Sequence, residues 1–255
     1  TGNRFEFRAV GSGQSVAGPL VAMNTILADS LEWIATQLEA QLAGGTSLEA
    51  ATFSVLKQVM QEHSAVIFGG DGYSSEWHRM AVEERGLENM PTTADALPVL
   101  QRPEIRDLFE RQGVLSPLEL ESRFEVYAEQ YILAIEVEAK LVLRMARTQI
   151  YPVVMGYMET LTRSLRDQEQ LGLHPDRSIA GQVASLNQQL VSQCTALEQA
   201  LAQVPHGGVS EHLTYCASTL LGLMLKVREA VDGLEATVDD AIWPLPTYQE
   251  LLFVR

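Results

Sequence analysis

The chain has 255 residues, which is enough for one or two domains with a buried core. It carries 18 Lys and Arg against 33 Asp and Glu, giving a formal net charge of −15. This balance argues against a nucleic-acid-binding protein, because phosphate contacts need a basic stripe, and it fits a soluble cytoplasmic protein. No apolar run approaches about 20 residues, so we expect no membrane span. The two cysteines, Cys194 and Cys216, are too few for a disulfide framework, and we expect both to be buried in helix packing.

The first element is a predicted strand with the sequence RFEFR, Arg4 to Arg8. Because side chains alternate between the two faces of a strand, Phe5 and Phe7 share one face. Arg4, Glu6 and Arg8 form a cation–anion–cation row on the other face. This row is either a solvated edge of a sheet or part of a catalytic sheet that holds a metal and an anion. The residues of the strand alone leave both interpretations open.

Helices are predicted over most of the remaining chain. A helix from about Pro19 to Ala43 has a broad apolar face, with apolar residues at spacings of three and four, and it ends at Gly44-Gly45. A second helix starts at a predicted capping box, Thr46 to Glu49, and runs to about Ala65. The turn FGGDGYSS precedes a short helix, EWHRMAVEER. Residues 87–115 are predicted to be loops with one or two helical turns.

Three long helices follow and predict an antiparallel hairpin bundle. The first starts at a capping box, Ser116 to Glu119, and runs to about Gln170, with a kink expected at Pro152. The second covers about 179–203 and the third about 211–238. The tail that follows cannot be helical through its two prolines, and we expect it to dock through five residues: Trp243, Tyr248, Leu251, Leu252 and Phe253. The predicted fold class is mainly α, with one N-terminal strand followed by long antiparallel helices.

Few arrangements of side chains in the helical part indicate chemistry. A di-iron site in a bundle needs Glu-x-x-His pairs, which the Glu-rich stretch around Glu129 and Glu136 does not contain. The histidines offer no pair at metal-ligand spacing on one helix. The glycines of GGDGYSSEWH could cradle a phosphate, but they lack the dinucleotide and P-loop spacings, which favours a turn followed by a Ser cap. The opening strand is therefore the only candidate site.

The sequence RFEFRAVGSGQSVAGPLVAMNTILADSLEWIA resembles the end of the catalytic domain of glutamine synthetase, in its type III form. GDGYSSEWH, SRFEVYAEQYILAIEVEAKL and WPLPTYQELLF resemble the same family further along the chain. The resemblance implies the C-terminal portion of a longer ligase. Residues 1–45 would complete the catalytic domain, and residues 46–255 would form a helical domain with a hairpin bundle at about 116–238 and a docking tail at 239–255.

The resemblance also implies an activity, which is ATP-dependent synthesis of glutamine from glutamate and ammonia through γ-glutamyl phosphate. Glu6 would be a ligand of Mg2+ or Mn2+ at the transferred phosphate. Arg8 would contact the glutamate carboxylate or the phosphoryl group, and Arg4 the phosphates of ATP. The family implies a homo-oligomeric ring, a dodecamer. Because the other metal ligands of this family are absent here, we expect this part alone to be inactive. The alternative is a structural or regulatory helical module for oligomer assembly or partner binding.

Overall fold

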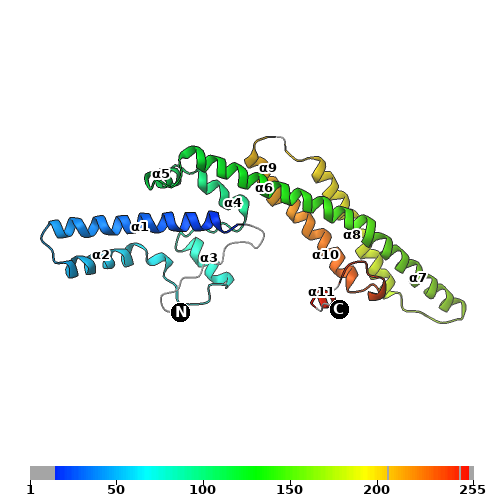
Figure 1. The fold of residues 1–255 in the computed structure, drawn as a ribbon. Helices are drawn as coiled ribbons and strands as arrows, with labels where there is room; N and C mark the ends of the chain where they lie inside the picture. Colours follow the sequence, from blue (N-terminus) through cyan, green and yellow to red (C-terminus); the bar gives the residue numbers. More distant parts are fainter. Residues whose placement is uncertain (1–14, 206, 247, 253–255) are drawn as a thin grey trace. The chain divides into compact units, whose positions relative to one another are not determined.

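The computed structural model describes residues 15–205, 207–246 and 248–252, and every regular element in these ranges is a helix (Figure 1). The mainly α class is confirmed. The predicted strand, Arg4 to Arg8, lies outside the described residues. Among the described helices, none is both long and apolar enough to cross a membrane. The chain divides into two compact units, one comprising Thr1–Pro91 with Pro98–Phe124 and the other Thr92–Leu97 with Glu125–Arg255.

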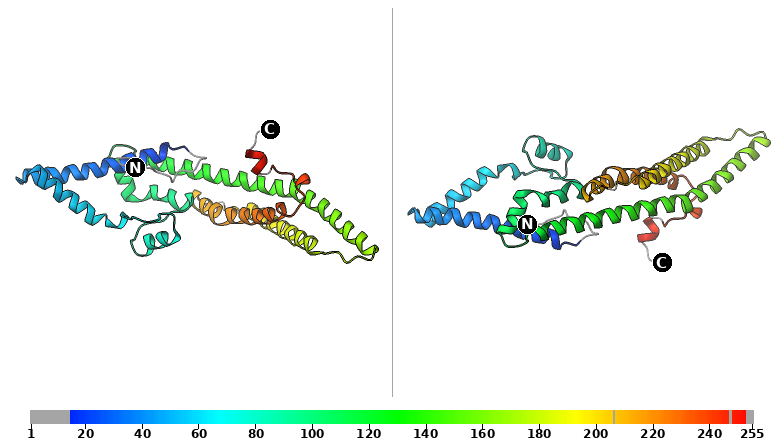
Figure 2. Two further views of the ribbon diagram at one scale, coloured as in Figure 1. Left: turned by 90° about the horizontal axis from the view of Figure 1, so that it is seen from below. Right: turned by 90° about the horizontal axis from the view of Figure 1, so that it is seen from above.

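The first unit contains an antiparallel pair of helices, α1 (Ala17–Ala43) and α2 (Leu48–Glu62), which contact each other and diverge away from their connecting turn (Figures 1 and 2). Gly45 ends α1 with a φ of 87°, a conformation that glycine adopts without steric cost. The N-cap of α2 is Ser47, whose hydroxyl accepts the Ala50 amide at 3.3 Å. The predicted capping box from Thr46 to Glu49 is therefore wrong: the cap lies one residue later and has Ala50 at its third position, while the Thr46 amide donates to the Gln41 carbonyl and closes α1.

The rest of the first unit is more helical than the sequence predicts. After a short 3-10 turn, η1 (Ser64–Val66), come α3 (Ser75–Glu83) and α5 (Pro103–Arg111), which has proline at its first position. The early turns of α6 (Pro117–Met145) also belong to this unit. The buried apolar side chains of the unit come from α2, α5 and α6: Ala51, Val55, Phe109, Leu120 and Phe124.

The second unit is a bundle of long helices. From residue 125 onward α6 continues through η3 (Ala146–Ile150) into α7 (Tyr151–Gln170), and α8 (Ser178–Ala202) returns beside it. The last stretch consists of α9 (Val209–Tyr215), η4 (Cys216–Leu220) and α10 (Leu221–Glu235). It packs mainly on α8. The capping box at the start of α6 is confirmed, with the Ser116 amide donating to Glu119 Oε2 at 2.8 Å and the Glu119 amide to Ser116 Oγ at 3.3 Å.

One apolar cluster holds the bundle together. Its members come from every long helix of the unit, and those at 0% exposure are Ala128, Ala139, Val154, Val183, Leu197, Cys216, Leu220 and Leu234. A short helix, α4 (Thr93–Ala96), packs on α9, and the 3-10 turn η2 (Leu97–Gln101) follows it. Burial of about 1.5–3 kcal/mol per large apolar side chain makes this cluster the main stabilising element of the unit.

Two π-helical turns, η3 and η4, interrupt the long helices. In η3 the Tyr151 amide donates to the Ala146 carbonyl, five residues back. The turn lies just before Pro152, which has no amide hydrogen and whose ring crowds the preceding turn of an α-helix. The disturbance predicted at Pro152 thus takes the form of a wider turn. Nothing in the sequence pattern predicted η4.

The C-terminal tail contains η5 (Asp240–Ile242) and α11 (Tyr248–Leu252). Trp243 is 9% exposed and belongs to the apolar cluster of the second unit, and Leu245 packs against the cluster. Leu251 and Leu252, in contrast, are 65% and 77% exposed. The tail therefore docks on its own unit through Trp243, and the leucines of α11 lie at the surface.

Candidate functional site

The predicted site residues Arg4, Glu6 and Arg8 lie outside the described residues, as do Phe5 and Phe7. The structure does describe the helix that follows them in the chain, α1. Its apolar face is exposed, at 46–56% for Leu20, Met23, Ile26, Leu27 and Leu31. The buried residue of α1 is instead polar: Thr25 is 2% exposed and bonds the Val21 carbonyl of its own helix at 2.8 Å.

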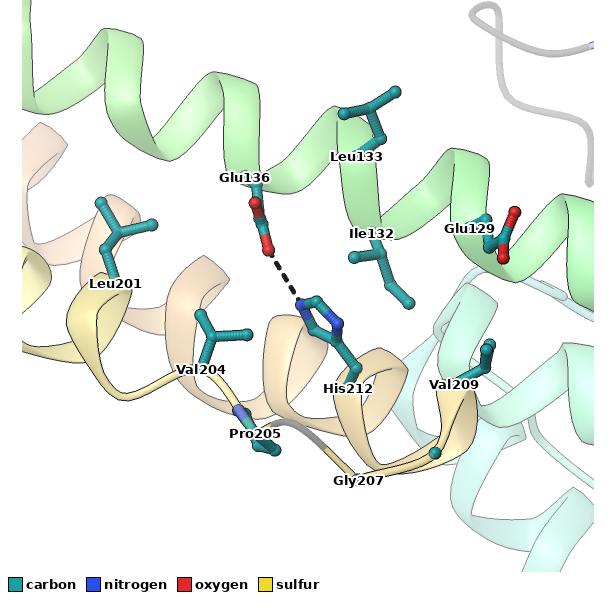
Figure 3. A pocket seen from close by; sticks show the side chains of 11 residues that line it. Glu129, Ile132, Leu133, Glu136, Leu201, Val204, Pro205, Gly207, Val209 and His212 are labelled. Atoms are coloured by element: carbon teal, nitrogen blue, oxygen red, sulfur yellow. Dashed lines mark hydrogen bonds and ion pairs between the residues drawn. The ribbon is translucent and has the colours of Figure 1, made fainter.

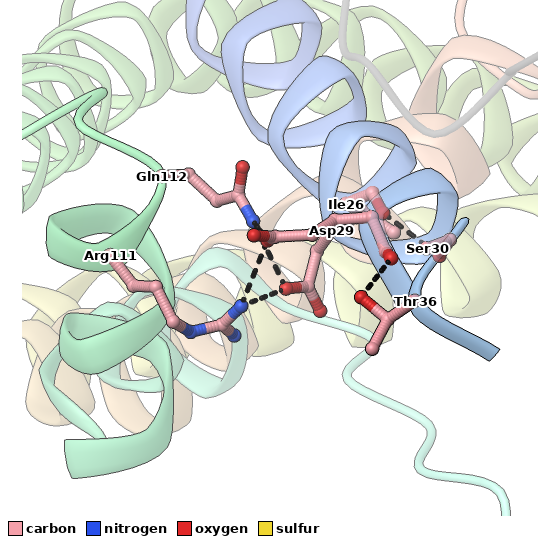
Figure 4. A network of polar contacts seen from close by, with 7 residues as sticks. Ile26, Asp29, Ser30, Thr36, Arg111 and Gln112 are labelled. Atoms are coloured by element: carbon pink, nitrogen blue, oxygen red, sulfur yellow. Dashed lines mark hydrogen bonds and ion pairs between the residues drawn. The ribbon is translucent and has the colours of Figure 1, made fainter. Parts of the chain in front are cut away.

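Polar contacts attach the opposite side of α1 to α5 and the residue after it (Figure 4). Arg111 Nη1 donates to Asp29 Oδ1 at 2.6 Å, and Gln112 Nε2 donates to Glu32 Oε2 at 2.6 Å. At about 100° per residue, Asp29 and Glu32 project from the side of the helix opposite Leu27. Within the first unit, α1 is therefore held by polar contacts on this side, and α2 packs on it further along, where Ile34 and Leu38 of the apolar face are half-buried. The N-terminal part of the apolar face, from Leu20 to Leu31, stays uncovered by the described residues.

An open hollow of about 530 Å³ lies in the second unit, between α6, α9 and the turn that precedes α9 (Figure 3). Its walls are mostly apolar, from residues such as Ile132, Leu201 and Val209. His212 Nε2 meets Glu136 Oε1 at 2.9 Å across it, and Lys140 Nζ donates to Glu136 Oε2 at 2.9 Å. One carboxylate thus joins α9 to α6 and is bound on both of its oxygens.

The electrostatics of this pair follow from its hydrogen bonds. The bond from Lys140 and its positive charge hold the pKa of Glu136 below its ordinary value, and the His212 bond acts in the same direction. The side chains of Glu136 and His212 are 20% and 24% exposed, so solvent weakens these bonds only in part. Because Glu136 and His212 are hydrogen-bond partners of each other, we assign the pair a structural role, which is to hold α9 against α6.

Both cysteines are buried, as predicted. Burial raises the pKa of the Cys216 thiol to about 11, and it also raises the pKa of Cys194. A thiol is nucleophilic as the thiolate, so neither side chain is a reactive group near neutral pH. Within the part of the chain that the structure describes, no group of three or more His, Cys, Asp and Glu residues could hold a metal ion.

The glycine-rich turn before α3 is a turn with a Ser cap, as the spacing favoured. The Trp77 amide donates to Ser74 Oγ at 3.2 Å, and the Tyr73 amide to Asp71 Oδ1 at 2.9 Å. Those two amides are therefore occupied and do not point at an anion. Arg85 holds the turn by donating to the Ala65 and Ile67 carbonyls at 3.0 and 2.8 Å.

An aromatic stack completes this turn. The rings of Phe68 and Trp77 stack with centroids 3.8 Å apart, and the Arg85 guanidinium lies 5.0 Å from the Trp77 ring centroid. A side chain at Gly70 would meet the Phe68 ring at 2.6 Å, which explains the glycine at that position. The turn is thus a packed structural element.

Sequence reasoning missed the bond between Glu136 and His212. The two residues are 76 positions apart and share no local motif, so no spacing rule could have found them. Sequence reasoning identified the apolar face of α1 but made no prediction of what covers it. Periodicity gives the side of a helix on which apolar residues lie, but it does not say whether the same chain covers that side.

Residues 51–169 match the family described as the glutamine synthetase C-terminal domain. Over essentially its whole length, the chain is 34% identical to a type-3 glutamine synthetase from Dictyostelium discoideum. It is 27% identical to a glutamine synthetase from Bacteroides fragilis (strain YCH46) and 30% identical to one from Butyrivibrio fibrisolvens. The resemblance to type III glutamine synthetase is confirmed.

The match to the glutamine synthetase C-terminal domain covers α2 to α7 apart from the first three residues of α2 and the last residue of α7. The chain spans 36% of the length of each of the three glutamine synthetases. The domain boundary expected between residues 45 and 46 concerns the longer protein and stays a prediction. The match rests on helices, and the residues expected to carry the chemistry lie N-terminal to it.

Proposed function

We propose that this chain is part of an ATP-dependent glutamate–ammonia ligase that makes glutamine through γ-glutamyl phosphate, a cytoplasmic step of nitrogen metabolism. The similarity to glutamine synthetases over essentially the whole of this chain supports the proposal. The observation that carries it beyond the family is the exposed N-terminal part of the apolar face of α1. That part of the helix exposes Leu20, Leu27 and Leu31, while Asp29 and Glu32 on the other side hold it to the first unit. An uncovered apolar face of this extent is expected to pack on a further body of protein.

We propose that this further body is the rest of a catalytic domain, of which residues 1–45 form the end. Residues 46–255 then form a helical C-terminal domain. The assembly is proposed to be a homo-oligomeric ring, a dodecamer. Under this proposal α1 positions the segment before it, because a helix packed on the catalytic domain fixes where the preceding strand enters.

The donor set Arg4, Glu6 and Arg8 fits the proposed reaction chemically. A carboxylate is a ligand that Mg2+ or Mn2+ accepts, so Glu6 would hold the ion together with the phosphates of ATP. Arg8 would hold the glutamate carboxylate or the transferred phosphoryl group through two parallel hydrogen bonds, and Arg4 would hold the nucleotide phosphates. The bound ion would offset the charge that develops on the phosphoryl oxygens. One carboxylate does not complete such a site, so the 255-residue chain alone is expected to be inactive.

The test uses the full-length protein with Glu6→Ala. Loss of a metal ligand at the transferred phosphate is expected to lower glutamine formation about 10³-fold or more, because several kcal/mol of transition-state stabilisation are removed. The melting temperature should not change. Binding of Mn2+, followed by electron paramagnetic resonance, should weaken in parallel. The matched control is Glu49→Ala, which removes an exposed carboxylate from the first turn of α2.

Near-normal turnover at saturating Mg2+ by the Glu6→Ala protein would contradict the role of Glu6 and favour the alternative. In that alternative, the chain is a helical module for assembly or partner binding, and its strand is a solvated edge. Arg8→Lys also distinguishes the ligase function from the alternative. It should lower glutamine formation if a planar guanidinium holds a carboxylate or phosphoryl group, and leave it unchanged if Arg8 lies at a solvated edge.

A further inference from the structure

The helix α6 has two apolar faces in the second unit. One face belongs to the buried cluster, through residues such as Ala128, Ile135 and Ala139, which are 0–7% exposed. The other face is an exposed stripe, defined by Val126, Leu133, Val137 and Leu141, which are 46–64% exposed. At about 100° per residue these four residues lie within a sector of roughly 80°, on the side of α6 opposite the cluster. The stripe therefore remains uncovered by the described residues.

Charged residues border the stripe in an ordered way. Glu129 lies on one edge of the stripe, and Lys140 lies on the same edge, three turns further along the helix. Arg144 continues the line of the stripe beyond Leu141. The Lys140 side chain is 62% exposed even though it bonds to Glu136. Among the described residues, no ion pair engages Glu129 or Arg144.

This order of charges makes the stripe complementary to itself in one orientation. If two copies pair antiparallel about a two-fold axis level with Ile135, Leu133 of one copy faces Val137 of the other. Such an axis keeps each edge on its own side, so Glu129 of one copy faces Lys140 of the other, and the contact is repeated by symmetry. Parallel pairing would instead put Glu129 of one copy and Lys140 of the other at different levels and on opposite edges of the contact, so they could not pair. A chain with a net charge of −15 repels its copies in general, so a locally balanced stripe is a suitable place for them to meet.

We propose that the exposed stripe of α6 is an antiparallel two-fold contact between two copies of this chain. In Figure 3 the Leu133 side chain, at the rim of the hollow, projects from α6 away from His212, so it is free to reach a second copy. Two helices that meet along one stripe bury less than the roughly 1,600 Å² of a standard interface. We therefore expect a weak contact that acts together with other contacts of an assembly, and a covalent trap is the appropriate test. The inference does not depend on the proposed enzymatic activity.

The test is a double variant of the full-length protein, Glu129→Cys with Lys140→Cys, under mild oxidation. In the antiparallel pair the two new thiols of different copies lie beside each other, so a disulfide-linked dimer is expected. Either single variant should give none. The two copies of residue 129, or of residue 140, are separated by about 15–18 Å along the helices, which is too far for a disulfide. Background from the native thiols in this chain is low, because Cys194 and Cys216 are 3% and 0% exposed, and the unsubstituted protein controls for the rest.

A second pair of variants tests the apolar part of the contact. Leu133→Lys in the double-cysteine protein should lower the yield of linked dimer about tenfold, as expected for removal of a central contact residue. Leu225→Lys is the matched control, since Leu225 is 60% exposed on α10 away from the stripe, and it should not change the yield. A linked dimer from Glu129→Cys alone would overturn the proposal, because the two copies of residue 129 are too far apart in the antiparallel pair to form a disulfide. The absence of linked dimer from the double variant would also overturn it. In that case, maleimide labelling of the thiols would distinguish a free face from one that another part of the protein covers.

Discussion

The helices α1 and α8 have similar apolar periodicity but differ in how much of the apolar face is covered by the described residues. Along α8, residues such as Val183, Leu190 and Leu197 are 0–1% exposed, because α7 and α10 pack on that helix. Along α1, Leu20, Leu27 and Leu31 are 55–56% exposed, and the helix is fastened through carboxylates on its other side. An amphipathic pattern therefore identifies an apolar helix face that needs a packing partner. It does not identify whether the partner is in the same stretch of chain.

The first prediction concerns the buried face of α8, where a substitution should cost the most stability. Leu197→Ala should lower the free energy of unfolding of the 255-residue chain by about 2–5 kcal/mol, because it removes apolar contacts and leaves a cavity in the cluster. Urea unfolding monitored by circular dichroism measures this. Leu225→Ala, at a 60% exposed position on α10, should change it by less than about 0.5 kcal/mol. Equal effects of the two substitutions would show that α8 is not packed as described.

The next prediction concerns the exposed apolar face of α1. Leu27→Ala should change the stability of the 255-residue chain by less than about 0.5 kcal/mol, because Leu27 is 56% exposed there. In the full-length protein the same substitution should cost about 2 kcal/mol or more, since we propose that the catalytic domain covers this face. Thermal unfolding of both proteins, each with Leu225→Ala as control, gives the difference. If the cost is the same in both lengths, α1 has no partner in the longer protein.

The smallest expected effect concerns a polar contact inside the bundle. Glu136→Gln should lower the stability of the chain by about 1 kcal/mol at pH 7, because it weakens the bonds to Lys140 and His212. The pKa of Glu136 is lowered in the folded protein, so its contribution is fully present above the ordinary value of 4.5. The contribution is lost as the pH falls from there through the folded pKa. Urea unfolding of both proteins at a series of pH values checks this. A difference that grows below pH 4.5 would contradict the assignment.

Much of the fold could be predicted from local sequence. Gly44-Gly45, the Ser116 to Glu119 box and the turn before residue 179 each mark a helix end by chemistry that acts over a few residues. The cap of α2 could not be placed between Thr46 and Ser47. Both residues are good caps, and the choice depends on which amide the end of α1 uses.

The candidate site was also predictable from the sequence only where it depends on neighbouring residues. A local alternation suggested Arg4, Glu6 and Arg8, and their roles come from the family resemblance, because no spacing rule connects them to the rest of a site. The Glu136–His212 bond depends on how α9 returns to α6, which is a property of the whole bundle. The exposed stripe of α6 was present in the sequence. It was hidden because the same helix also carries the apolar residues of the core.

The π turns determine which residues of the long helices face the core. A π turn holds one more residue than an α-helical turn, so each one changes the phase of the helix that follows it by about 100°. The residues after η3 reach the core only because of this shift, and Val154, four residues beyond η3, is fully buried. Removing one residue of η3, such as Thr148, would allow an ordinary α-helical turn and leave Val154 facing the cluster, whereas forcing η3 into α-helical geometry with its residues unchanged would turn Val154 away. The two π turns, η3 and η4, therefore each accommodate one extra residue while keeping the residues beyond them on the core face of their helix.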